Sequence, residues 1–253
     1  HGTSRRQRQM CIRDRFILEA NPRASRTMPF VSKVTGNQII KAGTLLMLGH
    51  SLYSIKKTTN YLNSSTNKVA IKKAIFPWSR FPAEDTMLGP EMKATGEVLG
   101  IGRSFGVALN KAYAAAGVEI NENEKGIFVS LSDQEKPNFI KIVKTYSDLG
   151  FKIYSTYGTG EYLKNNEINS TIVGRADETF PTSLTIIQDK LISLVINTPT
   201  FANEYTDGWK IRRLSHETGV AVVSSVREAE AFLKAFLETT KSFEDMEAIQ
   251  NVS

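Results

Sequence analysis

The second half of the chain, from about residue 124 to residue 240, alternates between short apolar runs and longer amphipathic stretches. The apolar runs are rich in Val and Ile, which is typical of buried strands, and the stretches between them have helical spacing. Strands and helices that alternate in this way are typical of a parallel sheet with helices on both faces. We therefore predict an α/β fold with five parallel strands at residues 126–131, 151–155, 170–173, 192–197 and 220–224, and helices at 133–150, 160–167, 183–191, 207–219 and 226–240.

The first half of the chain has a less regular pattern. Apolar runs at residues 16–20 and 69–78 predict strands. Residues 30–49 have helical spacing, with glycines at positions where helices could end. Residues 79–96 contain Gly and Pro at short intervals, and this composition predicts turns and irregular chain.

A further helix is predicted at residues 103–117, where Ser104 can cap the start and Gly117 can close the end. The polar spacer that follows this helix separates the irregular pattern from the regular one. We therefore expect a domain boundary near residue 120. The whole chain then divides into segments 1–15, 16–120, 121–240 and 241–253.

Composition narrows the class of protein. The 253 residues are 41% hydrophobic and 23% charged, which is typical of a soluble globular chain. No apolar run approaches the roughly 20 residues that span a membrane. Cys11 is the single cysteine, so an internal disulfide framework is excluded, and a reducing cytoplasm is the expected location. No cluster of His and Cys has the spacing of a zinc site.

The net charge of +6 is concentrated at the start of the chain. The first fifteen residues, "HGTSRRQRQMCIRDR", contain five arginines and one aspartate, so they supply +4 of that charge. The rest of the chain has no interleaving of basic and aromatic residues, and we do not expect it to bind nucleic acid. We interpret residues 1–15 as a disordered or foreign tail, with a basic arm as the alternative.

Polar residues follow each predicted strand of the second half. Ligands of open parallel sheets bind beyond the carboxyl ends of the strands, and hydroxyls, amides, cations and exposed backbone N–H groups suit an anion there. Each residue alone could equally be a helix cap or part of a turn, so the stretch "STYGTG" could be a tight turn or a phosphate cradle. The candidates for binding a phosphate-type ligand are Ser130, Lys136, Thr156, Gly158, Thr159, Arg175, Asn197 and Thr198, with Ser224 and Ser225 after the fifth strand.

A second candidate site lies in the stretch "LEANPR". Glu19, Asn21 and Arg23 alternate, which places their side chains on one side of an extended segment. A carboxylate and an amide oxygen suit Mg²⁺, and an adjacent arginine suits a phosphate. The alternative is a solvated strand edge with no ligand.

Three groups of motifs add a resemblance to a known family. In order along the chain they are "FILEANPRASRTMPFVSKVTG", "LGPEMKATGEVLGIGRSFGVALNKA" and the set "STYGTGEYL", "LVINTP" and "IRR". From about Phe16 to residue 238 the chain resembles the C-terminal portion of the large subunit of carbamoyl-phosphate synthase. The implied fold is the C-terminal remnant of an ATP-grasp domain followed by a methylglyoxal-synthase-like domain, with a five-stranded parallel sheet flanked by helices.

The resemblance implies a function and residue roles. The family makes carbamoyl phosphate from bicarbonate, ammonia and ATP for pyrimidine and arginine biosynthesis, with a glutamine amidotransferase small subunit as partner. Glu19 and Asn21 would hold Mg²⁺ (or Mn²⁺) on the phosphates of ATP, and Arg23 would lie beside those phosphates as the catalytic residue. The second domain would be regulatory. A nucleotide effector such as UMP or IMP would place its phosphate at the strand-end residues, namely Ser130, Lys136, Thr156, Gly158, Thr159, Asn197 and Thr198.

The chain departs from the family pattern at several positions. Arg175 stands where the family often has Lys, and Phe180 where it often has Arg. "TFAN", from Thr200 to Asn203, replaces an "SGRR" stretch that would supply two arginines near the effector. Lys73 replaces the Glu of ornithine-activated members, so ornithine activation is not expected. The glycine-rich loop of ATP-grasp is absent, and the isolated chain is expected to be inactive.

Two alternative functions belong to other classes. Methylglyoxal synthase, a lyase of similar fold, uses a carboxylate base in a "GGD"-like loop and a histidine after the fourth strand. Here the first stretch is "GRADE", which offers Asp177, and the second, "TFANEYTDGW", contains no His. The other alternative is a stand-alone effector-binding module, which the ATP-grasp-like residues at the start of the chain disfavour.

Overall fold

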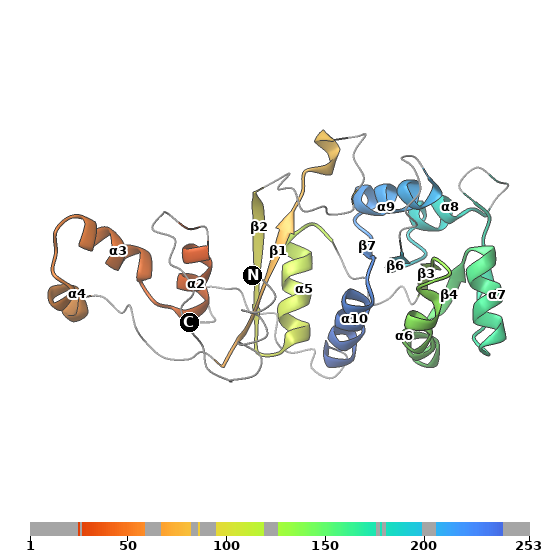
Figure 1. Cartoon of the computed structure of the whole chain (residues 1–253), viewed down its shortest axis with the longest axis horizontal. Helices are drawn as coiled ribbons and strands as arrows, with labels where there is room; N and C mark the ends of the chain where they lie inside the picture. The colour runs from red at the N-terminus through yellow and green to blue at the C-terminus, as the bar shows by residue number, and fades with distance from the viewer. Residues whose placement is uncertain are drawn as a thin grey trace, which may run out of the picture. The chain divides into compact units, whose positions relative to one another are not determined.

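The computed structural model describes residues 27–58, 67–81, 95–118, 126–175, 181–198 and 206–239, with single residues at 25, 86 and 178 (Figure 1). The chain divides into two compact units between Ser64 and Ser65. Helix α5 therefore belongs to the same unit as the predicted parallel sheet. The segment limits expected from the sequence, including the boundary near residue 120, stay predictions.

The first unit contains three short helices, α2 (Thr27–Thr35), α3 (Ile39–Met47) and α4 (Leu52–Thr58). The helical pattern at residues 30–49 therefore corresponds to two helices. Gly36 separates them with a φ of 69°, a conformation that glycine adopts without steric cost. Helix α4 was not expected from the sequence.

The second unit begins with an antiparallel strand pair, β1 (Val69–Ile75) and β2 (Gly96–Gly102), and a 3₁₀ helix, η1 (Trp78–Arg80), follows β1. Helix α5 (Phe105–Ala115) packs on this pair. The Ser104 hydroxyl accepts a hydrogen bond from the Val107 N–H, as the predicted cap requires. Strand β2 was not predicted. It lies so close to α5 that a Cβ on Gly100 would be 2.0 Å from the carbonyl oxygen of Ala108.

The five predicted parallel strands are confirmed. They are β3 (Gly126–Ser130), β4 (Lys152–Ser155), β5 (Thr171–Ile172), β6 (Leu194–Asn197) and β7 (Ala221–Val223), in the order β5-β4-β3-β6-β7. Every pairing in this sheet is parallel. The intervening helices are α6 (Lys136–Asp148), α7 (Tyr157–Asn165), α8 (Ser183–Gln188), α9 (Asp207–Thr218) and α10 (Val226–Thr239).

Helices cover both faces of the parallel sheet (Figure 1). On one face, Ile127 and Val129 of β3 pack with residues of α6, α7 and α10. On the other face, Phe128 packs with residues of α8 and α9. Successive residues of a strand point to opposite faces, so a strand with both faces buried is apolar throughout. Among the described helices, none is long and apolar enough to cross a membrane.

Candidate anion-binding site

The candidate site lies beyond the carboxyl ends of three neighbouring strands, β4, β3 and β6. Ser130, at the end of β3, pairs with Asn197 at the end of β6. The chain leaves β3 for β4 on one side and later returns to β6 on the other. This reversal opens a crevice where ligands of parallel sheets commonly bind. We call the edge formed by Ser130, Lys136, Thr156, Gly158, Thr159, Asn197 and Thr198 the anion rim.

Two hydroxyls of the anion rim hold the loop that follows β3. The Thr159 hydroxyl oxygen accepts hydrogen bonds from the Leu131 N–H and from the Thr156 hydroxyl, both at 3.1 Å. The Thr198 hydroxyl oxygen accepts from the Ser132 N–H at 2.7 Å. Thr159 is only 1% exposed, so it serves first to shape this loop. These bonds hold the loop in a defined conformation.

Lys136 and Gly158 lie next to each other at the starts of α6 and α7. The Lys136 ammonium is 2.6 Å from Oδ1 of Asp133, and the lysine side chain is 12% exposed while that of Asp133 is 92% exposed. A Cβ on Gly158 would lie 3.8 Å from the lysine Nζ. A positive charge thus stands beside a backbone segment that carries no side chain, and an anion could contact both.

The two glycines of "STYGTG" have different roles. Thr156 occupies the N-cap position of α7, which begins at Tyr157, so the stretch is both a strand end and a helix start. A Cβ on Gly160 would lie 2.7 Å from the Ser155 hydroxyl oxygen and 2.8 Å from a side-chain carbon of Ile172. Gly160 is thus required for packing, whereas Gly158 leaves space on the side of Lys136.

The structure adds a residue that sequence reasoning missed. Nη1 of Arg212, on α9, donates a hydrogen bond to Oδ1 of Asn197 at 2.7 Å, and both side chains are buried. A Cβ on Gly208 would lie 3.1 Å from this Nη1, so the first turn of α9 covers the bond. The sequence pattern that could have identified Arg212 is an arginine pair next to Ile211, which is buried, in an amphipathic helix.

The remaining candidates are not brought to the anion rim by the described contacts. Arg175 lies in an exposed turn after β5, where its backbone N–H donates to Oε2 of Glu178. Ser224 and Ser225 follow β7 and bond to the Glu228 carboxylate at the start of α10. Several positions lie outside the described residues, namely Glu19, Asn21, Arg23, Asp177, Phe180 and Thr200 to Asn203. Within the described ranges, no three His, Cys, Asp or Glu side chains are grouped as metal ligands.

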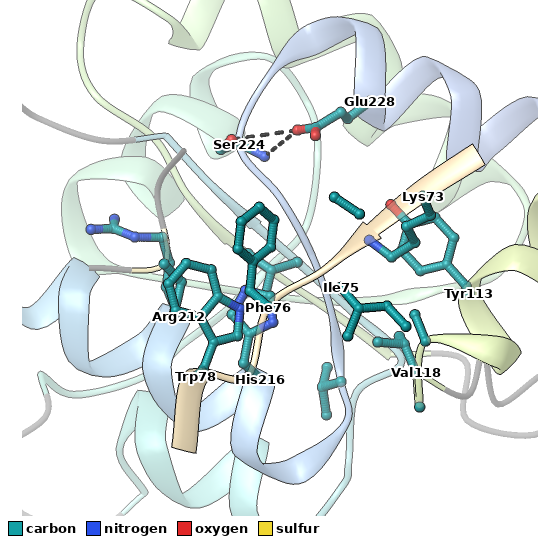
Figure 2. Close-up of a pocket in the computed structure, with 16 residues that line it drawn as sticks. Lys73, Ile75, Phe76, Trp78, Tyr113, Val118, Arg212, His216, Ser224 and Glu228 are labelled. Carbon is teal, nitrogen blue, oxygen red and sulfur yellow. Dashed lines mark hydrogen bonds between the residues drawn. The ribbon is translucent and has the colours of Figure 1, made fainter. Parts of the chain in front are cut away.

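A cavity of about 340 Å³ lies between β1, α5, α9 and the start of α10, and Arg212, which bonds to Asn197 of the anion rim, is one of the residues that line it (Figure 2). Nζ of Lys73 is 4.1 Å from the centre of the Tyr113 ring. The Trp78 ring lies between Phe76, stacked at 5.0 Å, and His216, at 5.8 Å. We call this space the β1 cavity.

Burial controls protonation in the β1 cavity. It lowers the pKa of Lys73 from its ordinary value of 10.5, and the negative charge of Glu228 offsets part of that effect. It also raises the pKa of Tyr113, and here the Glu228 charge acts in the same direction. The cavity thus contains one ammonium, that of Lys73, and one carboxylate, that of Glu228, and the expectation about ornithine stays a prediction.

The comparisons with known proteins agree with the fold. Residues 138–224 match the MGS-like domain, a span that contains the strands β4 to β7. The chain is 38% identical over 235 residues to the carbamoyl phosphate synthase large chain of Nostoc sp., with 93% of this chain and 21% of the relative covered. It is 37% identical over 243 residues to the C-terminal section of the large chain of Aquifex aeolicus, with 91% and 45% covered.

The chain is a homologue of the C-terminal part of carbamoyl phosphate synthase large chains. A similar C-terminal section from Methanocaldococcus jannaschii is 37% identical over 90% of this chain and 38% of the relative. The chain therefore spans between about a fifth and less than half of the curated relatives that it matches. The resemblance inferred from the sequence motifs and the MGS-like α/β fold are both confirmed.

Proposed function

We propose that the chain acts as part of a carbamoyl phosphate synthase large chain, and that its MGS-like domain is the effector-binding part. In this proposal the whole enzyme is a cytoplasmic ligase that forms carbamoyl phosphate from bicarbonate, ammonia and ATP. A glutamine amidotransferase small subunit supplies the ammonia. The identity of more than a third over nine-tenths of the chain supports the family assignment, and the activity is inferred from that family.

The proposed catalytic contribution lies near the start of the chain. Residues 16–120 would be the C-terminal part of an ATP-grasp unit. Glu19 and Asn21 would hold Mg²⁺ or Mn²⁺ on the ATP phosphates, and Arg23 would contact those phosphates. The bound metal would neutralise phosphate charge during transfer.

An activity measurement on a full-length large chain tests this contribution. Glu19→Gln removes one charged metal ligand and is expected to lower carbamoyl phosphate formation by orders of magnitude. Near-normal activity in that variant would refute the metal-ligand role. The same preparation, assayed with dihydroxyacetone phosphate, tests the lyase alternative, because release of methylglyoxal would favour it.

The proposed regulatory contribution is that the anion rim binds the phosphate of a nucleotide effector such as UMP or IMP. The observation that carries this proposal is the position of the Lys136 ammonium beside Gly158 at the edge shared by β4, β3 and β6. Backbone N–H groups at the start of α7 add donors on the same side of the sheet.

Calorimetric titration of the chain with UMP, IMP and inorganic phosphate tests the effector site. Lys136→Gln removes a charge-assisted hydrogen bond worth about 1.5–3 kcal/mol, so binding is expected to weaken roughly 10- to 150-fold. Lys141→Gln is the matched control, because Lys141 is an exposed lysine further along α6. Equal loss of affinity in both variants would refute a local contact, and absence of binding to the unmodified chain would remove the effector proposal.

A further inference from the structure

Asn197 and Arg212 form a buried polar pair at the anion rim. Asn197 is 2% exposed and ends β6, where it pairs with Ser130 of β3. Arg212 is 5% exposed and lies on α9. The guanidinium donates to the amide oxygen at 2.7 Å. A hydrogen bond from a charged donor is about twice as strong as a neutral one, and burial under the first turn of α9 strengthens it further.

This bond determines which end of the Asn197 amide is available to a ligand. A carboxamide has an acceptor oxygen on one side and a donor NH₂ on the other, and a flip about its last torsion exchanges them. A guanidinium has donors alone, so only the oxygen can face Arg212. The NH₂ group is then left on the opposite side of the amide, and a donor there attracts an anion where an oxygen would repel it.

We infer that Arg212 is a positioning residue, which fixes the Asn197 amide so that its NH₂ group donates to a phosphate bound at the anion rim. The inference rests on the proposed effector function of that rim. It also identifies a positive charge next to the rim that comes from α9. The replacement of the two arginines by "TFAN" therefore does not leave the site without an arginine.

Gly208 is part of the same arrangement. A Cβ at this position would lie 3.1 Å from Nη1 of Arg212, which is tighter than ordinary contact, and 3.4 Å from Oδ1 of Asn197, at the limit of ordinary contact. A side chain there would push the two groups apart. The absence of a side chain at residue 208 thus allows α9 to cover the bond and exclude water from it.

The neighbouring Arg213 provides a matched control. It is 8% exposed, and its guanidinium bonds instead to Oε1 of Glu217 at 2.7 Å and to the Phe81 carbonyl at 2.8 Å. Arg212→Met and Arg213→Met therefore remove the same charge from adjacent, similarly buried positions of one helix. They differ in whether the lost partner is Asn197.

The test is calorimetric titration of the whole chain and its variants with inorganic phosphate and with UMP. Arg212→Met is expected to weaken phosphate binding at least about 10-fold, the loss of one well-oriented charge-assisted donor. Arg212→Lys keeps a donor and should recover part of that affinity, while Arg213→Met should bind as the wild type does. Wild-type affinity in Arg212→Met would overturn the inference.

A second variant keeps the inference testable if Arg212→Met fails to fold. Asn197→Asp retains a partner for Arg212 but turns an oxygen toward the ligand, so it should fold and bind phosphate at least about 10-fold more weakly. Wild-type affinity in Asn197→Asp would overturn the inference.

A spectroscopic readout separates positioning from a purely structural role. The side-chain NH₂ signals of Asn197, identified by their loss in Asn197→Asp, should be sharp in the wild type and should shift when phosphate is added. They should broaden in Arg212→Met. Phosphate binding that leaves these signals unshifted would refute the inference alone, whereas a wild type that binds neither phosphate nor UMP would refute the effector function and the inference together.

Discussion

The anion rim and the β1 cavity each contain one lysine, and the two ammonium groups have different surroundings. In the rim, Lys136 pairs with the exposed carboxylate of Asp133 at 2.6 Å. In the cavity, Lys73 lies over the ring of Tyr113, and burial lowers its pKa. The first charge is balanced by an exposed carboxylate, while the lysine side chain itself is 12% exposed. The second is held against aromatic and apolar side chains, which solvate it poorly.

The difference also concerns how each region is assembled. The rim consists of strand ends and helix starts of one sheet, linked by hydrogen bonds between side-chain hydroxyls and backbone N–H groups. The cavity joins β1 and α5 to α9 and α10, and its walls depend on close packing between helix and strand. We therefore expect packing substitutions to affect the cavity most and polar substitutions to affect the rim most.

The largest loss of stability is expected from Gly100→Ala. The added methyl group would lie 2.0 Å from the Ala108 carbonyl oxygen and 2.6 Å from the Ala112 nitrogen, so α5 and β2 must separate. We expect the free energy of unfolding to fall by at least about 3 kcal/mol, measured by urea denaturation. The phosphate affinity of the molecules that remain folded should not change.

Gly96→Ala is the matched control on the same strand. Its Cβ would lie 3.2 Å from the Ile75 carbonyl oxygen, a contact that a small shift relieves. A loss of less than about 1 kcal/mol is expected. If Gly100→Ala weakened phosphate binding as well as stability, packing in the β1 cavity would affect the anion rim, and Arg212, which contacts both, would connect them.

The next largest loss of stability is expected at one of two threonines of the anion rim, and the other should lose much less. Thr159→Val preserves shape but leaves the buried Leu131 N–H without its acceptor, so the free energy of unfolding should fall by about 1–3 kcal/mol. Thr156→Val removes a hydroxyl that is half-buried, and the loss should stay below about 1 kcal/mol while phosphate binding weakens. Thermal or urea unfolding and calorimetry measure the two quantities. Equal stability losses would contradict the assignment of Thr159 to loop structure.

These two regions were not equally predictable. The five parallel strands followed from apolar, β-branched runs separated by helical patterns, and the rim followed from them because the carboxyl ends of parallel strands meet at one edge. Strand β2 was missed because Gly96, Gly100 and Gly102 lower its strand propensity, and its pairing with β1 is a long-range contact. The bond between Arg212 and Asn197 joins α9 to the end of β6, and local sequence does not determine which polar side chains of two separate elements meet.

A smaller effect is expected from Lys73→Met in the β1 cavity. Methionine has a similar volume and buries no charge, so the free energy of unfolding at pH 7 should equal or exceed the wild-type value, within about 1.5 kcal/mol. The pKa of Lys73 in the folded protein lies below its ordinary value of 10.5. The unfolded chain therefore binds more protons between these two values, and wild-type stability gains from Lys73 as the pH rises through them.

The difference in the free energy of unfolding between the wild type and Lys73→Met isolates the contribution of the Lys73 charge. The advantage of Lys73→Met should be largest below the folded pKa of Lys73 and should vanish above about pH 10.5. The rise in the pKa of Tyr146, which burial causes, destabilises both proteins at alkaline pH and cancels in the comparison. A variant that is clearly less stable than the wild type at pH 7 would mean that the contacts of the ammonium with Tyr113 and Glu228 outweigh its desolvation.

The smallest effect on stability is expected from Asp133→Asn, which removes the counter-ion of Lys136. The Asp133 side chain is 92% exposed, and such surface pairs contribute between about 0 and 1 kcal/mol. Phosphate binding should nevertheless become a few-fold tighter at low salt, because the carboxylate no longer competes with the anion for the ammonium, and the gain should shrink as salt screens the charge. Asp148→Asn, at the far end of α6, is the control and should leave phosphate affinity unchanged. Weaker binding in Asp133→Asn would mean that the carboxylate holds the lysine in position for the anion, and the two lysines would then differ in the rigidity of their surroundings more than in their solvation.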